Sequence, residues 1–268
     1  MDFRVRNKIN RILSYGSFFK FFNIGKSLVS SSQDYKAGEV DEFHKKNALQ
    51  FDAQSCIEFG AGRSLGQNLF LSNVLERQYL YDIDNLLIMK MVNAYACQFT
   101  EVFEKGKEKV KKVEDLLKVG IHYYAPFDVR NDKTTKDIDF FISTSTLEHI
   151  PEKDIKPLLL HIKGMLREGG RLSLHIDYSD HFSHSDPAIG RNNFLQFSDQ
   201  EWSYYNTKVC YQNRLRHMHY KRIFVDCGFK IIFEEAKVYD VAPMTINWSL
   251  MTGNETDLAT TGRWLLEK

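Results

Sequence analysis

The stretch that decides the fold reads CIEFGAGRSLG, residues 56–66. It begins with a short apolar run that carries one acid, Glu58, and ends in a glycine-rich turn. Glycines let the backbone pass close to a ligand, and the free N–H groups at the start of a helix can bind one. This pattern of strand, glycine turn and helix is typical of nucleoside-binding α/β domains, although a tight turn without a ligand has the same pattern.

Short apolar runs alternate with helical segments over the rest of the chain. The further runs lie at 79–81, 121–124, 138–143, 171–176, 229–233 and 262–266. Helical spacing predicts helices over 63–76, 86–99, 101–118 and 155–166, the last of them ended by a pair of glycines. Strands separated by such helices form right-handed βαβ units. We therefore predict a doubly wound α/β domain over residues 40–268, with a mostly parallel sheet of seven strands.

Five segments in register resemble the class I S-adenosylmethionine-dependent methyltransferases. Glu58 stands two residues before the first glycine, and Asp82 ends the second run, 20 residues beyond Gly62. The other matching segments are IDFFIS (138–143) with LEHIP (147–151), MLREGGRL (165–172) and CGFK (227–230). The resemblance spans about residues 50–236 and implies a Rossmann-like methyltransferase sheet.

The resemblance also implies residues for the methyl donor, S-adenosylmethionine. The turn Gly60, Ala61 and Gly62 would lie under its methionyl portion, and Glu58 would hold its ammonium group. Asp82 would bind the ribose hydroxyls, with Asp84 as a rival two residues on. The remaining implied donor residues are Asp128 for the adenine amino group and Ser143 or Thr144 beside the donor.

Candidate catalytic residues follow the predicted fourth and fifth strands, because a hydroxyl acceptor needs a base to take its proton. The titratable residues there are His149, His175, Asp177, Asp180, His181, His184 and Asp186. We expect Asp177 and His181 to form a pair of base and orienting group, with His149 as a further candidate. The same residue types could ligate a divalent ion or simply hydrogen-bond within a loop, and the sequence assigns no metal.

An insertion at about 178–222 is expected to cover the acceptor. It interleaves aromatic residues, such as Trp202 and Tyr211, with Arg191, Arg214 and Arg216. Aromatic faces suit sugar stacking and arginines suit phosphate or carboxylate, whereas the aromatics could equally form a small core of their own. We therefore expect O-methylation of a small molecule or of a cell-surface glycan precursor.

Composition excludes other classes of protein. The chain has 36 basic and 35 acidic residues, a net charge of +1, which argues against nucleic-acid binding. Its four cysteines have no metal-ligand or disulfide spacing, and no apolar run is long enough to span a bilayer. These features predict a cytoplasmic protein. The segment 1–39 is basic and amphipathic in its first thirty residues, which predicts contact with the inner face of a membrane or plain packing on the domain.

Two other functions fit parts of the sequence. Tyr204 and Lys208 have the Tyr-x-x-x-Lys spacing of nicotinamide-dependent short-chain reductases, but the Asn-Asn-Ala-Gly turn of that family is missing. A methyltransferase fold that has lost its activity and serves as a scaffold would keep the same strands. The retained glycine turn and both acids favour an active methyltransferase over either alternative.

Overall fold

The computed structural model describes residues 2, 4–6, 8, 35–100, 103, 109–208, 210–239 and 246–268. They divide into two compact units, neither of which is a continuous stretch of chain. The glycine unit holds the described residues of Val29–Thr144, Leu158–Leu174 and Trp264–Lys268. The histidine unit holds those of Met1–Leu28, Ser145–Pro157 and His175–Arg263.

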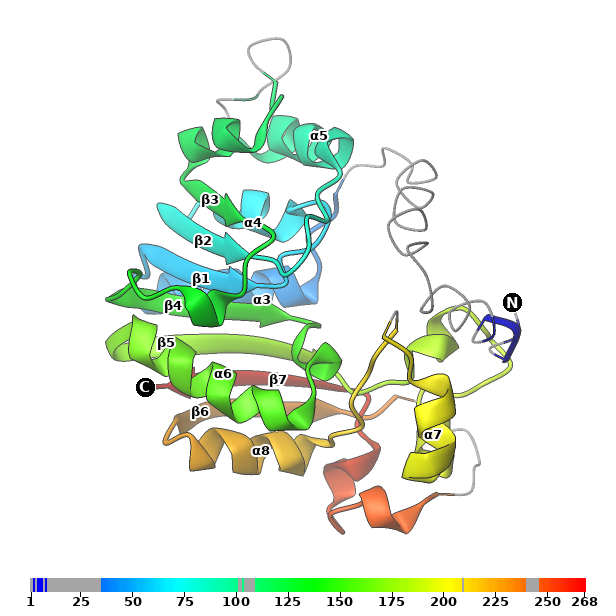
Figure 1. The fold of residues 1–268 in the computed structure, drawn as a ribbon. Coiled ribbons are helices and arrows are strands. Elements are labelled where there is room, and N and C mark those ends of the chain that lie inside the picture. Colours follow the sequence, from blue (N-terminus) through cyan, green and yellow to red (C-terminus); the bar gives the residue numbers. More distant parts are fainter. Residues whose placement is uncertain are drawn as a thin grey trace. The chain divides into compact units, whose positions relative to one another are not determined.

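The strands form a sheet of seven, in the order β3-β2-β1-β4-β5-β7-β6 (Figure 1). They are β1 Ser55–Phe59, β2 Arg77–Tyr81, β3 Ile121–Tyr124, β4 Ile138–Thr144, β5 Leu166–Asp177, β6 Lys230–Lys237 and β7 Thr261–Glu267. The pairs β1–β2, β1–β4 and β2–β3 are parallel. Strand β7 is antiparallel to β5, because Lys268 N–H donates to Gly170 O whereas Tyr178 N–H donates to Thr260 O. The predicted seven-stranded, mostly parallel sheet is confirmed.

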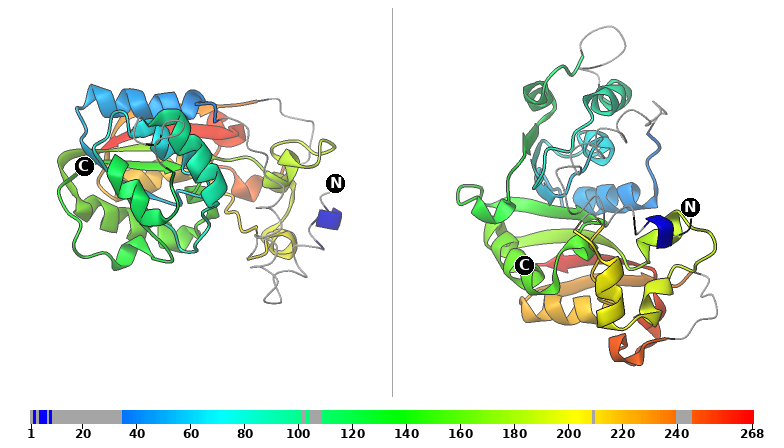
Figure 2. Two further views of the ribbon diagram at one scale, coloured as in Figure 1. Left: turned by 90° about the horizontal axis from the view of Figure 1, so that it is seen from above. Right: turned by 45° about the vertical axis from the view of Figure 1, so that its right-hand side comes forward.

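The α-helices are α3 Glu39–Gln50, α4 Gly66–Leu71, α5 Met89–Phe99, α6 Glu152–Met165, α7 Asp199–Tyr205 and α8 His217–Asp226. Helix α4 contacts both α3 and α5 (Figure 2). It is shorter than predicted, because Gly62 and Leu65 have left-handed backbone conformations and the helix begins only at Gly66.

Two further predicted helices differ from the structure. Within 101–118 the described residues form a 3-10 helix, η2 Val113–Val119, while 101–102 and 104–108 lie outside the described residues. Helix α6 ends at Met165 and β5 begins at the next residue, so the glycine pair lies inside the strand. A Cβ at Gly170 would lie 2.9 Å from Arg167 O, which explains why the strand has a glycine there.

The glycine unit has a core of aliphatic side chains around β1, every residue of which is buried. Leu69 of α4, Leu80 of β2 and Val92 of α5 pack together there and are fully buried. Burial of such side chains stabilises a fold by ~1.5–3 kcal/mol each. This packing fixes the position of the glycine turn, because the turn joins β1 directly to α4.

Most of the predicted N-terminal segment lies outside the described residues, so its membrane contact stays a prediction. Arg6, which is described, donates a hydrogen bond to Ser185 Oγ. Among the residues that the structure describes, no helix combines the length and the apolar character needed to cross a bilayer.

Candidate active site

The turn after β1 is built on glycines with positive φ. Gly60 has φ 73° and Gly62 has φ 80°, conformations in which a side chain would be strained. Gly60 N–H donates to Tyr81 O at 2.8 Å, which ties the turn to the end of β2. The turn residues Gly60, Ala61 and Gly62 therefore run close to the end of β2, where Asp82 follows.

Glu58 is a buried carboxylate at the end of β1. Its side chain accepts hydrogen bonds from Gln67 Nε2 at 3.2 Å and from Asn68 Nδ2 at 2.5 Å. Burial outweighs these hydrogen bonds and raises the pKa of Glu58 to about 8, and the charges of Asp82 and Asp41 act in the same direction. No ion pair to Glu58 occurs within the described ranges, so its charge would be stabilised by a cationic ligand.

Asp82 follows β2 directly and is 3% exposed. Its carboxylate accepts hydrogen bonds from Tyr123 Oη at 2.9 Å and from the backbone N–H of Gly62. Burial raises the pKa of Asp82 to about 6, with a smaller contribution from Asp84. Asp84 itself is exposed. The structure thus places Asp82, and not its rival, beside the glycine turn.

A chain of hydrogen bonds leads from Glu58 to helix α3. Gln67 accepts from Thr144 Oγ1 at 2.9 Å, and Thr144 Oγ1 lies 2.9 Å from His44 Nε2. His44 Nδ1 lies 2.7 Å from Ser173 Oγ, which accepts from Asn47 Nδ2 at 3.0 Å. These hydrogen bonds therefore connect Glu58 with four elements of the glycine unit, namely α4, β4, α3 and β5.

The orientation of the Gln67 amide decides which group is the donor in each of these hydrogen bonds. Gln67 donates to Glu58 through its amide nitrogen, so its oxygen accepts the hydroxyl hydrogen of Thr144. Thr144 must then accept from His44 Nε2, which leaves Nδ1 to accept from Ser173. Every donor thus points toward the Glu58 carboxylate, which stabilises its charged form when a cation is present.

Sequence analysis missed the contribution of α3 to this site. Asp41, His44 and Asn47 are buried on the helix at a spacing of three residues. A stripe of polar residues on an otherwise buried helix face requires partners in the interior. That spacing was visible in the sequence and could have predicted the network.

Two other predicted donor residues stand apart from this arrangement. Ser143 is fully buried, and its hydroxyl has no hydrogen-bond partner in the described part of the chain. Asp128 caps a short 3-10 helix and forms an ion pair with Arg130, Oδ2 to Nη2, at 2.6 Å. The bonds from Arg130 lower the pKa of Asp128. Its role toward adenine therefore stays a prediction, and its carboxylate already has a partner.

The histidine unit contains Asp177 and His181, the predicted pair of general base and orienting group. Asp177 Oδ2 lies 3.3 Å from His181 Nε2 and 3.5 Å from His184 Nε2. Ser179 Oγ donates to Asp177 Oδ1 at 2.6 Å. Burial acts to raise the pKa of Asp177, but the neighbouring His181 and the hydrogen bonds from Ser179 outweigh it and lower the pKa to about 2. Asp177 is thus an ionised group beside His181, and its orienting role stays a prediction.

His149 joins the same cluster, since its ring centroid lies 4.9 Å from that of His181. His149 Nδ1 lies 2.7 Å from the backbone oxygen of Tyr211, so Nδ1 carries the hydrogen. Partial loss of hydration around the ring lowers the pKa of His149, although one side of the residue is exposed. His175 Nδ1 lies 3.2 Å from Ser145 Oγ.

Glu148 is a residue of this cluster that sequence analysis missed. It is 1% exposed, and ligand atoms of Glu148, His149 and His181 all lie within 4.8 Å of one another. Burial raises its pKa well above the usual range of a glutamate, although the backbone N–H groups of Glu148 and Asp177 oppose this. In the sequence Glu148 is only part of the segment LEHIP, because nothing local shows that a glutamate in the short 3-10 helix Leu147–His149 is buried.

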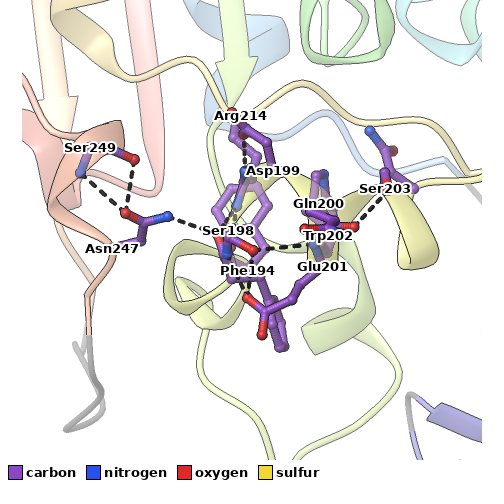
Figure 3. A network of polar contacts seen from close by, with 12 residues as sticks. Phe194, Ser198, Asp199, Gln200, Glu201, Trp202, Ser203, Arg214, Asn247 and Ser249 are labelled. Carbon is purple, nitrogen blue, oxygen red and sulfur yellow. Dashed lines mark hydrogen bonds and ion pairs between the residues drawn. The ribbon is translucent and has the colours of Figure 1, made fainter.

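A cavity of about 390 Å³ is lined mostly by the insertion after β5, together with Glu152, Ser249 and Leu250. Trp202, Tyr211, Arg214 and His219 are among its lining residues. On one wall, Arg214 forms an ion pair with Asp199, Nη2 to Oδ1, at 2.5 Å (Figure 3). Tyr211 and Gln212 connect the cavity to the histidines, because Tyr211 O holds His149 and Gln212 Oε1 accepts from His181 N–H at 3.2 Å.

The aromatic and arginine residues of the insertion are mainly structural. Phe194 and Trp202 are buried in a small core of their own, as the alternative interpretation of the sequence proposed. Arg216 is fully buried and donates to the backbone oxygens of Tyr178 and Asp257. Arg214 donates to two backbone oxygens besides its ion pair. Both arginines thus use their donors within the protein, Arg214 inside the insertion and Arg216 also on Asp257, contrary to the phosphate or carboxylate contacts expected with a ligand.

No protein-family model matches the chain, and no curated protein sequence matches it either. Solved structures match in fold. An S-adenosylmethionine-dependent methyltransferase from Clostridium acetobutylicum is 11% identical, covers 94% of this chain and 99% of its own, and has a TM-score of 0.53. The 1,6-didemethyltoxoflavin-N1-methyltransferase of Burkholderia thailandensis, crystallised with 1,6-didemethyltoxoflavin and S-adenosylhomocysteine, is 13% identical with a TM-score of 0.51. It covers 85% of this chain and 76% of its own.

A third similar structure belongs to a longer protein. A candidate O-methyltransferase from Nostoc punctiforme is 12% identical, covers 85% of this chain and has a TM-score of 0.50. The match covers 55% of that structure's chain, so this chain spans about half its length. At these identities the three likenesses establish the fold and leave substrate and activity to be argued from the site.

Proposed function

Because this chain has the fold of the class I S-adenosylmethionine-dependent methyltransferases, we propose that it transfers a methyl group from S-adenosylmethionine to an oxygen of a small polar molecule. The observation that carries the proposal is the pair of buried carboxylates, Glu58 and Asp82, at the ends of adjacent strands. Both have raised pKa values and lie beside a turn built on positive-φ glycines. A ligand with an ammonium group and a ribose satisfies both.

The residues of the glycine unit suit the donor. Glu58 would hold the ammonium group and Asp82 the ribose hydroxyls, while Gly60, Ala61 and Gly62 leave room for the methionyl portion. Thr144 would position Gln67 and through it Glu58, and Ser143 and Asp128 are the remaining proposed donor residues. When bound, the donor supplies a methyl group activated by a sulfonium charge, and the chain's task is alignment of the acceptor.

The histidine unit suits the acceptor. A cavity of about 390 Å³ falls in the usual range for small-molecule sites, and most of its lining residues are polar or charged. His149, Asp177 and His181, tied to the lining residues Tyr211 and Gln212, would take the proton from an acceptor hydroxyl. The buried aromatics of the insertion favour a small molecule over the glycan precursor, because they leave few faces for sugar stacking.

The structure gives little support to the nicotinamide-dependent alternative. Tyr204 lies near the end of α7, which stops at Tyr205, so Lys208 is outside the helix. Residues four apart lie on one face only when both are helical. The two residues therefore do not share a helix, as the Tyr-x-x-x-Lys motif of that family would require.

Calorimetry tests the proposal at the donor site. We expect S-adenosylhomocysteine to bind and NADH not to bind. Replacing Asp82 with alanine should weaken binding by roughly 1.5–3 kcal/mol, because charge-assisted hydrogen bonds to the ribose are lost. The matched control is Asp84→Ala, which changes an exposed carboxylate two residues away and should bind as wild type.

Two results would contradict the assignment. If Asp84→Ala weakens binding and Asp82→Ala does not, Asp84 binds the ribose and Asp82 does not. If the folded wild-type protein binds neither nucleotide, the chain is a scaffold with a methyltransferase fold, the alternative that sequence analysis left open.

A further inference from the structure

Three side chains of the histidine unit are arranged as the ligands of a metal ion. Their ligand atoms, one each from Glu148, His149 and His181, all lie within 4.8 Å of one another. From this arrangement we propose that Glu148, His149 and His181 bind a divalent transition-metal ion. No resemblance or comparison assigns a metal to this chain.

Glu148 provides the first observation, since its carboxylate is buried in a way that calls for a cation. It is 1% exposed, and neither carboxylate oxygen makes a hydrogen bond of normal geometry with the described residues. A buried carboxylate in that state is costly unless it is paired, protonated or bound to a metal. The negative charge of Asp177 also disfavours an ionised Glu148 and so increases this cost. A divalent cation bound to the Glu148 carboxylate would remove the cost.

The two histidines provide the second observation, because each ring has a nitrogen available to an ion. His149 Nδ1 donates to Tyr211 O at 2.7 Å, which orients the ring and leaves Nε2 for the metal. A backbone oxygen on the nitrogen that does not bind the metal is a characteristic partner of metal-ligating histidines. His181 Nε2 is buried and makes no hydrogen bond with the described residues, although Asp177 Oδ2 lies 3.3 Å away.

The donor set indicates the kind of ion. Two imidazoles and one carboxylate suit Mn²⁺, Fe²⁺, Co²⁺ or Zn²⁺, whereas Mg²⁺ and Ca²⁺ prefer oxygen ligands alone. Three protein ligands leave at least one coordination position open. His149 is exposed, so an oxygen from solvent or from a substrate can reach that side. If the proposed function holds, the ion would orient an acceptor hydroxyl and ease the loss of its proton, and His149 and His181 would then serve as its ligands in place of the role of bases.

Metal binding can be measured without the donor or acceptor. We would remove metals from the full-length protein with a chelator, dialyse the chelator away and titrate with Mn²⁺, following the electron paramagnetic resonance signal of free Mn²⁺. Mn²⁺ is the preferred probe because the chain has four free cysteines, two of them partly exposed, and thiolates favour softer ions. We expect one Mn²⁺ per chain and a higher melting temperature with the ion bound.

Three variants make the test specific. Glu148→Gln and His181→Ala should each weaken Mn²⁺ binding by at least ~10-fold. The matched control is His184→Ala, which also changes a histidine near Asp177 but lies outside the three ligands, and it should bind within about twofold of wild type. Without metal, Glu148→Gln should melt no lower than wild type, because it removes an uncompensated buried carboxylate.

The outcomes separate this proposal from the proposed function. Failure of the wild type to bind either Mn²⁺ or Zn²⁺ would overturn the metal site, as would undiminished binding by Glu148→Gln. Either result could stand beside normal binding of S-adenosylhomocysteine, which would leave the methyltransferase proposal intact. Loss of nucleotide binding with metal binding preserved would overturn the methyltransferase proposal alone.

Discussion

Replacing Glu58 with glutamine should remove most of the pH dependence of donor binding. The pKa of Glu58 in the free protein is about 8, because burial outweighs the bonds from Asn68 and Gln67. At pH 6 only about 1% of such a group is ionised, and at pH 7 about 10%. If the donor's ammonium group requires the ionised form, the association constant rises about tenfold between these pH values.

Asp82 adds a smaller effect of the same sign. With a pKa of about 6, it is half ionised at pH 6 and almost fully ionised at pH 7, which contributes a further factor of about two. We therefore expect wild-type affinity for S-adenosylhomocysteine to rise about 20-fold from pH 6 to pH 7, with about one proton released on binding at pH 7. An α-amino group has a pKa near ~7.8, so the ligand stays mostly protonated over this range.

Calorimetry in two buffers of different ionisation enthalpy measures both the affinity and the proton release. Glu58→Gln should retain only the twofold change that Asp82 causes and should release almost no proton at pH 7. Asp84→Asn, which neutralises an exposed carboxylate, should keep the full 20-fold change. The reasoning would be refuted by a wild-type affinity that is equal at pH 6 and pH 7, or by an undiminished pH dependence in Glu58→Gln.

The same raised pKa affects the stability of the free protein. Folded Glu58 binds its proton more tightly than the unfolded chain does, so the free energy of unfolding should fall as the pH rises from 4.5 to about 8. At ~1.4 kcal/mol per pKa unit, the loss for the free protein approaches roughly 5 kcal/mol. Glu58→Gln should flatten this decline in urea unfolding curves recorded across that range.

Two further variants test the other parts of the site. Asp177→Asn should lower methyl transfer from labelled S-adenosylmethionine to a small-molecule cell extract by at least ~100-fold, because Asp177 is proposed to orient His181. Affinity for S-adenosylhomocysteine should stay within about threefold, since Asp177 is not proposed to touch the donor. Wild-type turnover in this variant would contradict the assignment. Gly66→Ala should destabilise the protein by ~1–3 kcal/mol in urea unfolding, since its Cβ would lie 2.3 Å from the Tyr35 ring, and adding Tyr35→Leu should recover the loss. An unchanged stability in Gly66→Ala alone would show that Tyr35 does not close the start of α4.

Local patterns predicted the sheet, and they placed the proposed donor residues at its strand ends. Glu58, Gly62 and Asp82 stand at the ends of short apolar runs, where strand, turn and helix are fixed by neighbouring residues. The hydroxyls and amides behind Glu58 were not predicted, because His44 and Ser173 lie 129 positions apart in sequence. Contacts of that kind depend on tertiary packing, and only the buried polar stripe on α3 pointed to them.

The acceptor side was less predictable for the same reason. Asp177 and His181 are four residues apart, and the structure places their side chains 3.3 Å from each other, while their role as a base and its orienting group stays a prediction. Glu148 was overlooked because its importance lies in its burial and in the absence of a normal hydrogen bond among the described residues. Arg216 was misjudged because the neighbouring sequence does not distinguish an arginine that is buried among backbone oxygens from one at the surface.

The discontinuity of the two units has a consequence for synthesis on the ribosome. The chain passes between the units at residues 144 and 145, within α6, within β5 and within β7. Trp264, Leu265 and Leu266 of β7 are almost fully buried and belong to the glycine unit, whose other strand segments end at Leu174 or earlier in the chain. The apolar surface that receives β7 stays uncovered until residues 264–268 leave the exit tunnel. A nascent chain stalled before that point is therefore a substrate for chaperones, however complete its donor-binding residues are.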